Sequence, residues 1–259
     1  MSDLRDATHW LCDMDGVLIH DERAVPGASE FIDRLRERGR PLLVVTNNSL
    51  YEPKEISERL SALGLDVLAQ EIWTSALATA SFVSGQRAAA RVFAIGRRAM
   101  HVALADAGCV RDDQAPDFVV LGETQEYSFD DFARAIQLIE GGAIFVSTNP
   151  EPTGPSPRGS LPGCGAMAAL VERATGVAPY VVGKPNPFMI REALSRLGAE
   201  PRHSVLVGDR VETDVLVGAA AGVTTVMVLS GVGTLDQARR APVRPDLVVG
   251  SVSDLLEQV

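Results

Sequence analysis

The 259-residue sequence has none of the segments that carry a chain into or across a membrane. No apolar run approaches the ~20 residues that a transmembrane helix needs. The first ten residues, MSDLRDATHW, carry charges of both signs and no apolar stretch of the kind found in secretory signals. We therefore expect a cytoplasmic protein with no membrane partner.

Cysteine is scarce, with Cys12, Cys109 and Cys164 as the only three. An odd number at wide spacing fits neither a disulfide framework nor a Cys-x-x-Cys metal site. We expect reduced thiols, as is usual in the cytoplasm.

Basic residues are in the minority, because 24 Lys and Arg face 34 Asp and Glu for a formal net charge of -10. Binding to a nucleic acid backbone depends on clustered Lys and Arg, so we expect no nucleic acid polymer as partner. A small anionic ligand is compatible with this balance, since distant surface charges are screened beyond roughly 8 Å in physiological salt.

The sequence does contain a series of short apolar runs, each followed by a polar cluster and a helix-like stretch. Continuous rather than alternating runs are typical of strands covered on both faces, which predicts a Rossmann-like, doubly wound parallel α/β sheet. The expected strands are 10–12, 42–45, 205–207, 225–229 and 247–249. The expected helices are 28–38, 53–63, 187–197 and 212–221.

The middle of the chain repeats this pattern as a second set. Its expected strands are 92–95, 118–121 and 144–147, and its expected helices are 98–107, 129–140 and 165–175. The segment 149–165 is so rich in Pro and Gly that we expect no regular structure there. The sequence thus predicts a discontinuous core, 1–78 and 182–259, with residues 79–181 inserted as a lid-like domain.

Polar side chains follow the core strands, at the edge where an open parallel sheet binds its ligands. They are Asp13 and Asp15 in LCDMDG, Thr46, Asn47 and Asn48 in VVTNNS, Lys184 in VGKPNP, and Asp209 and Asp214 in LVGDRVETDV.

Carboxylates gathered at one edge repel each other, by about 4 kcal/mol for two charges 4 Å apart at an effective dielectric near 20. A divalent cation or a proton must relieve this, and oxygen ligands without nitrogen or sulfur favour Mg²⁺. The cation and Lys184 would neutralise a phosphoryl group, while Thr46 and Asn47 hydrogen-bond its oxygens. The arrangement predicts phosphoryl transfer with Mg²⁺ as cofactor.

Asp13 and Asp15 suit two different chemical roles. An aspartate can attack phosphorus, and a second carboxyl can protonate the leaving alcohol and then deprotonate water. Residues i and i+2 of an extended backbone point to the same side. In isolation the pair could instead be a helix N-cap with a solvated turn, and Asp214 could be only a first-turn acid stabilised by the helix dipole.

The motifs resemble those of the haloacid dehalogenase superfamily in order: DMDGVL, VVTNN, GKPNP with Lys184, and GDRVETD. The large insert between the second and third motifs resembles a C2-type cap. Further stretches, including PDFVVLGET and VLSGV, are similar to the NagD-like phosphatases of this superfamily. The similarity covers nearly the whole chain.

The resemblance implies a role for each site residue. Asp13 would be the nucleophile and Asp15 the general acid and base. Mg²⁺ would be held by the Asp13 carboxylate, the Asp15 backbone carbonyl and Asp209, with Asp214 orienting Lys184 or a metal-bound water. Thr46, Asn47, Asn48 and Lys184 would bind the substrate phosphate.

The implied substrate is a small phosphorylated metabolite such as a nucleoside monophosphate, phosphoglycolate or an aryl phosphate. The TNNS sequence at Asn48 and Ser49 is more similar to the phosphoglycolate phosphatase branch than to NagD. Specificity is expected in the insert, where the loop 149–165 with Arg158 would contact the leaving group. The family also implies a homodimer or higher homo-oligomer through the cap.

Two other functions use related residues. A phospho-accepting signalling protein would store an aspartyl-phosphate with little turnover, and a haloacid dehalogenase acting on carbon would lack the second aspartate and the metal. Asp15 argues against the signalling protein, because it supplies a base for rapid hydrolysis of the phosphoenzyme. It also argues against the dehalogenase, because that enzyme has no second aspartate.

Overall fold

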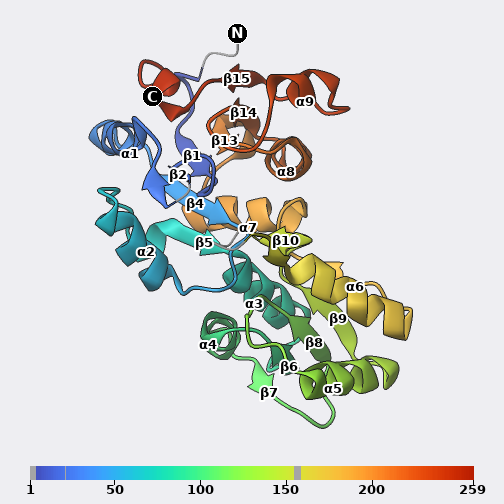
Figure 1. Ribbon diagram of the computed structural model, residues 1–259. Helices are drawn as coiled ribbons and strands as arrows, with labels where there is room; N and C mark the ends of the chain where they lie inside the picture. The colour runs from blue at the N-terminus through green and yellow to red at the C-terminus, as the bar shows by residue number, and fades with distance from the viewer. Residues whose placement is uncertain (1–3, 21, 155–158) are drawn as a thin grey trace. The chain divides into compact units, whose positions relative to one another are not determined.

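The computed structural model describes residues 4–20, 22–154 and 159–259 (Figure 1). Parallel sheets flanked by helices confirm the predicted α/β class. The chain forms two compact units. Unit 1 consists of the described residues of Met1–Thr46, Pro53–Trp73 and Lys184–Val259, and unit 2 of those of Asn47–Glu52 and Thr74–Gly183.

Unit 1 is built around a six-stranded sheet in the order β15-β14-β13-β1-β4-β5. β1 pairs in parallel with β4 and β13, and β14 pairs in parallel with β13 and β15. The strands are β1 (His9–Cys12), β4 (Leu42–Thr46), β5 (Ile72–Thr74), β13 (Ser204–Gly208), β14 (Thr224–Val228) and β15 (Leu247–Val249). A short antiparallel pair, β2 (Ile19–His20) and β3 (Arg23–Ala24), lies outside this sheet.

The helices of unit 1 bury one face against apolar partners. In α1 the buried residues recur at a spacing of one, three or four positions: Ala28, Phe31, Ile32 and Leu35. The ring of Phe31 packs edge-on against the ring of Trp10 in β1, with 5.6 Å between the ring centroids. The helices are α1 (Ala28–Glu37), α2 (Pro53–Ala62), α7 (Pro187–Leu197), α8 (Leu216–Ala221) and α9 (Leu235–Arg240). Short 3₁₀ turns lie at Ala69–Glu71, Pro201–His203 and Val252–Leu255.

The predicted helix 212–221 is wrong in its first half. A π-helical turn covers Val211–Val215, and α8 begins only at Leu216. The amide of Val215 donates to the carbonyl of Arg210, five residues back. Such wide turns are rare and occur often at functional sites.

Unit 2 contains a five-stranded sheet in the order β12-β9-β8-β6-β7, with parallel pairing throughout. Its strands are β6 (Arg91–Ile95), β7 (Val110–Arg111), β8 (Phe118–Leu121), β9 (Ile144–Ser147) and β12 (Tyr180–Val181). Its helices are α3 (Ser75–Gln86), α4 (Arg98–Asp106), α5 (Phe129–Glu140) and α6 (Cys164–Thr175). The central strands and the last three helices lie where the sequence predicts them.

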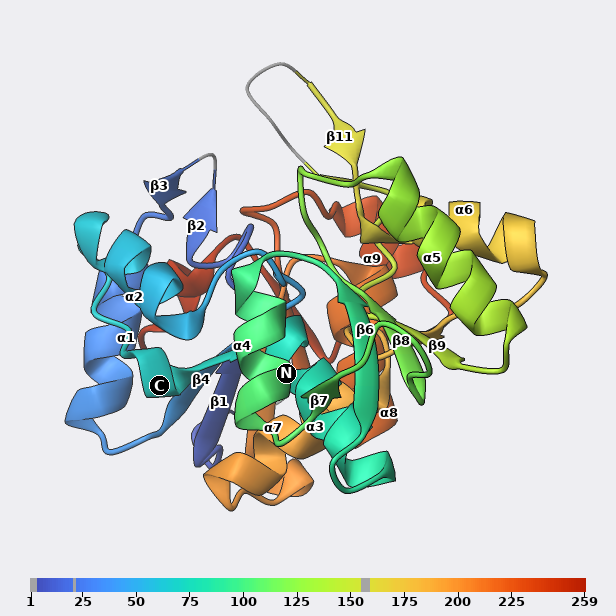
Figure 2. The ribbon, with the colours of Figure 1, turned by 90° about the horizontal axis from the view of Figure 1, so that it is seen from below.

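Successive side chains of each strand point to opposite faces of the unit 2 sheet, and a pair of helices packs on each face. Phe93, Val119 and Phe145 share a core cluster with residues of α5 and α6. α5 and α6 run side by side, and α3 and α4 form the other helix pair (Figure 2).

The prediction that the segment 149–165 has no regular structure is wrong. β10 (Thr153–Gly154) and β11 (Leu161–Pro162) form a short antiparallel pair. Two-residue strands tolerate Pro and Gly because little of a hydrogen-bond ladder is lost. Arg158 lies outside the described residues.

The two units and the predicted domains have different boundaries. The prediction of a catalytic core at 1–78 and 182–259 with a cap at 79–181 stays a prediction. The main segment of unit 2 begins at Thr74, the last residue of β5, and unit 2 also includes the segment Asn47–Glu52, which directly follows β4. This segment contains two residues expected to bind the substrate.

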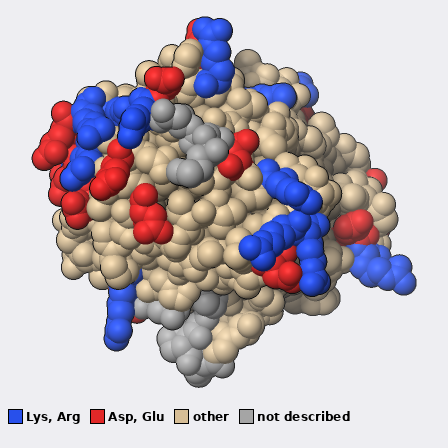
Figure 3. Space-filling view, turned by 90° about the horizontal axis from the view of Figure 1, so that it is seen from above, with Lys and Arg blue, Asp and Glu red and all other residues tan. Residues whose placement is uncertain are grey.

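The face drawn in Figure 3 carries Lys and Arg side chains interleaved with Asp and Glu, without a continuous basic stripe. That face therefore lacks the extended basic surface on which a nucleic acid backbone binds. Within the described residues, none of the helices has both the length and the apolar character needed to cross a lipid bilayer.

Substitution of Leu11 by alanine tests the packing of the unit 1 sheet. Leu11 is fully buried in β1. Its loss should lower the free energy of unfolding by about 2–5 kcal/mol in urea denaturation. Leu68→Ala is the matched control, since Leu68 is 44% exposed and its loss should cost no more than about 0.5 kcal/mol. Equal effects of the two substitutions would contradict this account of the core.

Candidate active site

Asp13 follows directly after the buried strand β1. Its amide donates to the carbonyl of Val207 at 2.8 Å, which continues the β1–β13 ladder by one residue. Its Oδ1 accepts from the amide of Met14 at 2.8 Å and from Nζ of Lys184 at 2.8 Å. The carboxylate is therefore fixed by strand geometry and by a buried cation.

Lys184 lies between two carboxylates and is only 2% exposed. Nζ is 2.8 Å from Asp13 Oδ1 and 2.7 Å from Asp214 Oδ1. Burial by itself lowers the pKa of a lysine, but the two carboxylates outweigh it and raise the pKa of Lys184 above its usual value. The side chain therefore stays protonated.

Asp214 occupies the π-helical turn, and its position excludes the interpretation as a solvated first-turn acid. Besides Lys184, it accepts through Oδ2 from the amide of Arg210 at 3.1 Å and from Thr213 Oγ1 at 3.2 Å. A Cβ on Gly208 would lie 2.1 Å from the Asp214 Cβ. A glycine at the end of β13 is thus required for Asp214 to approach the sheet.

Asp209 is enclosed by glycine backbones. Its Oδ2 accepts from the amide of Val232 at 2.8 Å. A Cβ on Gly231 would lie 2.0 Å from that oxygen, and one on Gly16, whose φ is +78°, would lie 2.4 Å from it. The sequence SGVG after β14 supplies part of this enclosure, and its place at the carboxyl end of a parallel strand is the sequence signal for that role.

Three of the carboxylates form one buried cluster. Asp13, Asp209 and Asp214 each offer an oxygen, and the three oxygens lie within 4.8 Å of one another. Burial raises the pKa of Asp13 and of Asp209, against the lowering effects of Lys184 on Asp13 and of the Val232 amide on Asp209. The single positive charge of Lys184 does not neutralise three carboxylates. Their oxygens are ligands of the kind that Mg²⁺ prefers, so the cluster fits this ion.

Asp15 does not belong to that cluster. Its side chain is exposed. Protein atoms around it still displace enough water to raise the pKa of its carboxyl, against the opposing charges of Lys184, Arg59 and Arg210. A carboxyl that holds its proton more tightly than usual and remains open to solvent is suited to proton transfer.

The second motif divides between the two units. Thr46 is buried at the end of β4, and the register that pairs Cys12 with Val44 brings this strand end beside Asp13. Asn47 and Asn48 belong to unit 2. Asn47 Nδ2 donates to Glu151 Oε1 at 2.6 Å, and Asn48 Oδ1 accepts from the amides of Leu50 and Tyr51. The joint action of these asparagines with Asp13 stays a prediction.

The thiol next to Asp13 is not a competing nucleophile. Cys12 is fully buried, and burial together with the charge of Asp13 raises the pKa of its thiol well above the usual value. Cys12, Cys109 and Cys164 are all free, as the sequence predicts.

The fold is a doubly wound α/β sheet. A buried aspartate, a lysine and a carboxylate cluster lie at the carboxyl edge of this sheet. This combination is typical of enzymes that hydrolyse phosphate esters. Residues 10–110 match the family described as haloacid dehalogenase-like hydrolase, and residues 181–255 match a second description, HAD-hydrolase-like.

The sequence similarity to curated relatives extends over almost the whole chain. A dihydroxyacetone phosphatase of Corynebacterium glutamicum is 47% identical over 96% of this chain and 90% of its own. The ribonucleotide monophosphatase NagD of Escherichia coli is 40% identical over 95% of this chain and 96% of its own.

The chain therefore belongs to the haloacid dehalogenase-like hydrolases and is a NagD-like phosphatase. Solved structures agree with this assignment. NagD superposes with a TM-score of 0.91 over 96% of this chain and 98% of its own. A glycerol phosphate phosphatase of Mycobacterium tuberculosis in complex with magnesium is 33% identical and has a TM-score of 0.91, over 99% of this chain and 80% of its own.

Substitution of Lys184 by methionine tests the buried ion pairs. The chain has two lysines, and Lys54, 81% exposed, provides the matched control. Lys184→Met should cost about 3–5 kcal/mol of unfolding free energy at neutral pH, because it leaves buried carboxylates without their cation. Lys54→Met should change it by no more than about 0.5 kcal/mol.

The loss in Lys184→Met should shrink as the pH is lowered, because protonation removes the uncompensated negative charge. Urea denaturation at several pH values measures both effects. A loss that is independent of pH would mean that packing of the lysine stem, not its charge, stabilises the site.

Proposed function

We propose that the chain is a Mg²⁺-dependent phosphomonoesterase that acts on small phosphorylated metabolites through an aspartyl-phosphate on Asp13. The observation that carries this proposal is the fixed position of Asp13. Both hydrogen bonds of its carboxylate are accepted by Oδ1, and among the described residues no hydrogen bond is made to Oδ2. Oδ2 is thus the oxygen available to attack phosphorus.

In the first step Asp13 Oδ2 forms a bond to phosphorus as the ester P–O bond breaks. Asp15 gives its proton to the leaving oxygen, which its raised pKa favours. In the second step Asp15 takes a proton from water, the water oxygen bonds to phosphorus, and Asp13 is released as carboxylate. Phosphate and an alcohol are the products.

Lys184, Thr46 and the asparagines Asn47 and Asn48 would hold the phosphoryl oxygens during both steps. Lys184 stays charged because its two carboxylate partners hold its proton. Thr46 offers a hydroxyl at the end of β4, the strand that pairs with β1, and Asn47 and Asn48 offer amides in the residues that follow. Positioned donors of this kind stabilise charge that develops in the transition state.

Asp13 and Asp209, with the backbone carbonyl of Asp15, would hold the Mg²⁺. The ion would add positive charge next to the phosphoryl group, which is the role that such ions have in phosphoryl transfer. Asp214 is already bonded to Lys184, Arg210 and Thr213, so it suits the orientation of Lys184 better than direct coordination. The carboxylates of Asp13 and Asp209 are both buried, which supports a bound cation at this position.

The substrate class follows from the relatives' names, which include dihydroxyacetone phosphatase and ribonucleotide monophosphatase. We place dihydroxyacetone phosphate, glycerol phosphate, phosphoglycolate and nucleoside monophosphates ahead of larger esters, with 4-nitrophenyl phosphate as a generic probe. The loop 149–165 would contact the leaving group, and a homo-oligomer formed through the cap remains a prediction from the family resemblance.

Substitution of Asp13 by asparagine tests the nucleophile. Phosphate release from this substrate panel with Mg²⁺ should fall by roughly 10⁴-fold or more, as when other covalent nucleophiles are removed. Circular dichroism should show that the fold is kept. Asp106→Asn is the matched control, because Asp106 is an exposed residue at the end of α4.

Metal-dependent turnover by the wild type with one preferred substrate would identify the physiological branch. Turnover by Asp13→Asn at the wild-type rate would exclude the covalent mechanism. A wild type that accumulates phosphorylated Asp13 without releasing phosphate would instead favour the signalling function.

A further inference from the structure

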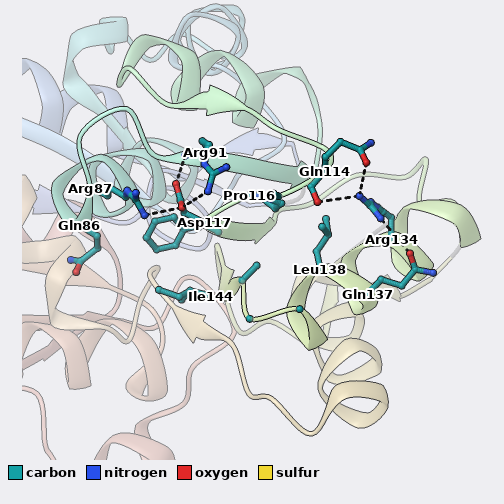
Figure 4. A pocket seen from close by; sticks show the side chains of 15 residues that line it. Gln86, Arg87, Arg91, Gln114, Pro116, Asp117, Arg134, Gln137, Leu138 and Ile144 are labelled. Carbon is teal, nitrogen blue, oxygen red and sulfur yellow. Dashed lines mark hydrogen bonds and ion pairs between the residues drawn. The ribbon is translucent and has the colours of Figure 1, made fainter.

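Unit 2 contains an open cavity of about 710 Å³ that no predicted site residue lines (Figure 4). It lies where β8 and β9 begin, between the end of α3 and one side of α5. Phe118, Leu138 and Ile144 supply apolar surface, and Arg87, Arg91 and Arg134 supply charge. The volume falls within the range of roughly 300–1,000 Å³ that is usual for small-molecule sites.

Two of the arginines are held in place by a single carboxylate. Asp117 Oδ1 accepts from Arg87 Nη1 at 2.9 Å and from Arg91 Nη2 at 3.1 Å, and Oδ2 accepts from the Arg91 amide at 2.9 Å. The hydrogen bonds from Arg91 also lower the pKa of Asp117. Each guanidinium has five N–H donors, so most of those on Arg87 and Arg91 are left for other acceptors.

The third arginine is held by backbone instead of by a carboxylate. Arg134 Nε donates to the carbonyl of Asp113 at 2.8 Å. The lining therefore contains three arginines and one aspartate, in a chain whose formal net charge is -10. Asp112, at 3.4 Å from Arg91, lies outside the lining and offsets part of this excess.

We propose that this cavity binds a small organic anion with phosphate or carboxylate groups. Guanidinium groups match such groups in pairs of parallel hydrogen bonds, and their pre-positioning reduces the entropy lost on binding. The apolar part of the ligand would pack on Ile144, which is 54% exposed. All lining residues belong to unit 2 and none is assigned to phosphate hydrolysis, so the site is independent of the proposed function.

Calorimetric titration of the full chain in metal-free buffer tests the cavity. Citrate and inorganic pyrophosphate serve as separate carboxylate and phosphate probes. Arg91→Gln and Arg87→Gln should each weaken the binding of at least one probe by about tenfold, the effect of one charged hydrogen bond. Arg173→Gln is the matched control, because Arg173 is an exposed arginine of α6.

Weakening by Arg91→Gln and Arg87→Gln but not by Arg173→Gln would support the site, and the probe affected would tell phosphate from carboxylate ligands. Binding that is equal in all variants would place the anion elsewhere and overturn the proposal. Absence of heat at millimolar concentrations of both probes would overturn it as well.

Discussion

The ion pairs of Lys184 with Asp13 and Asp214 are the interaction on which the site depends. A buried ammonium with two carboxylate partners keeps its charge, and each carboxylate is held in turn by a backbone amide at a strand end or in a turn. The charges do not balance, because one ammonium faces three buried carboxylates once Asp209 is included. That excess of negative charge is the physical reason for expecting a cation there.

The backbone around these carboxylates is as constrained as the side chains. Gly208 lets Asp214 approach the sheet, and Gly16 and Gly231 leave room for Asp209. A Cβ at any of these positions would overlap the carboxylate or its stem. The π-helical turn at Val211–Val215 has the same purpose, since it places Asp214 on Lys184 and lets its second oxygen accept from Arg210. Local backbone geometry and charge therefore act together.

Much of the fold could be read from the sequence, because strands covered on both faces leave continuous apolar runs. The three-residue strand β5 was missed, since so short a run gives no periodicity to recognise. The pair β10 and β11 was missed because Pro and Gly hide strands this short. Asp214 could not be decided from sequence, because a first-turn acid and a buried partner of lysine have the same local pattern.

The sequence by itself determined the chemical groups of the site, since Asp13, Asp15, Lys184 and Asp209 follow apolar runs in recognisable motifs. Only the tertiary structure decided their partners. It placed Lys184 between two carboxylates, joined Asn47 to Glu151, and gathered three arginines around a cavity in unit 2. Such contacts join residues far apart in the chain and depend on strand order and helix packing, which local patterns of residues do not specify.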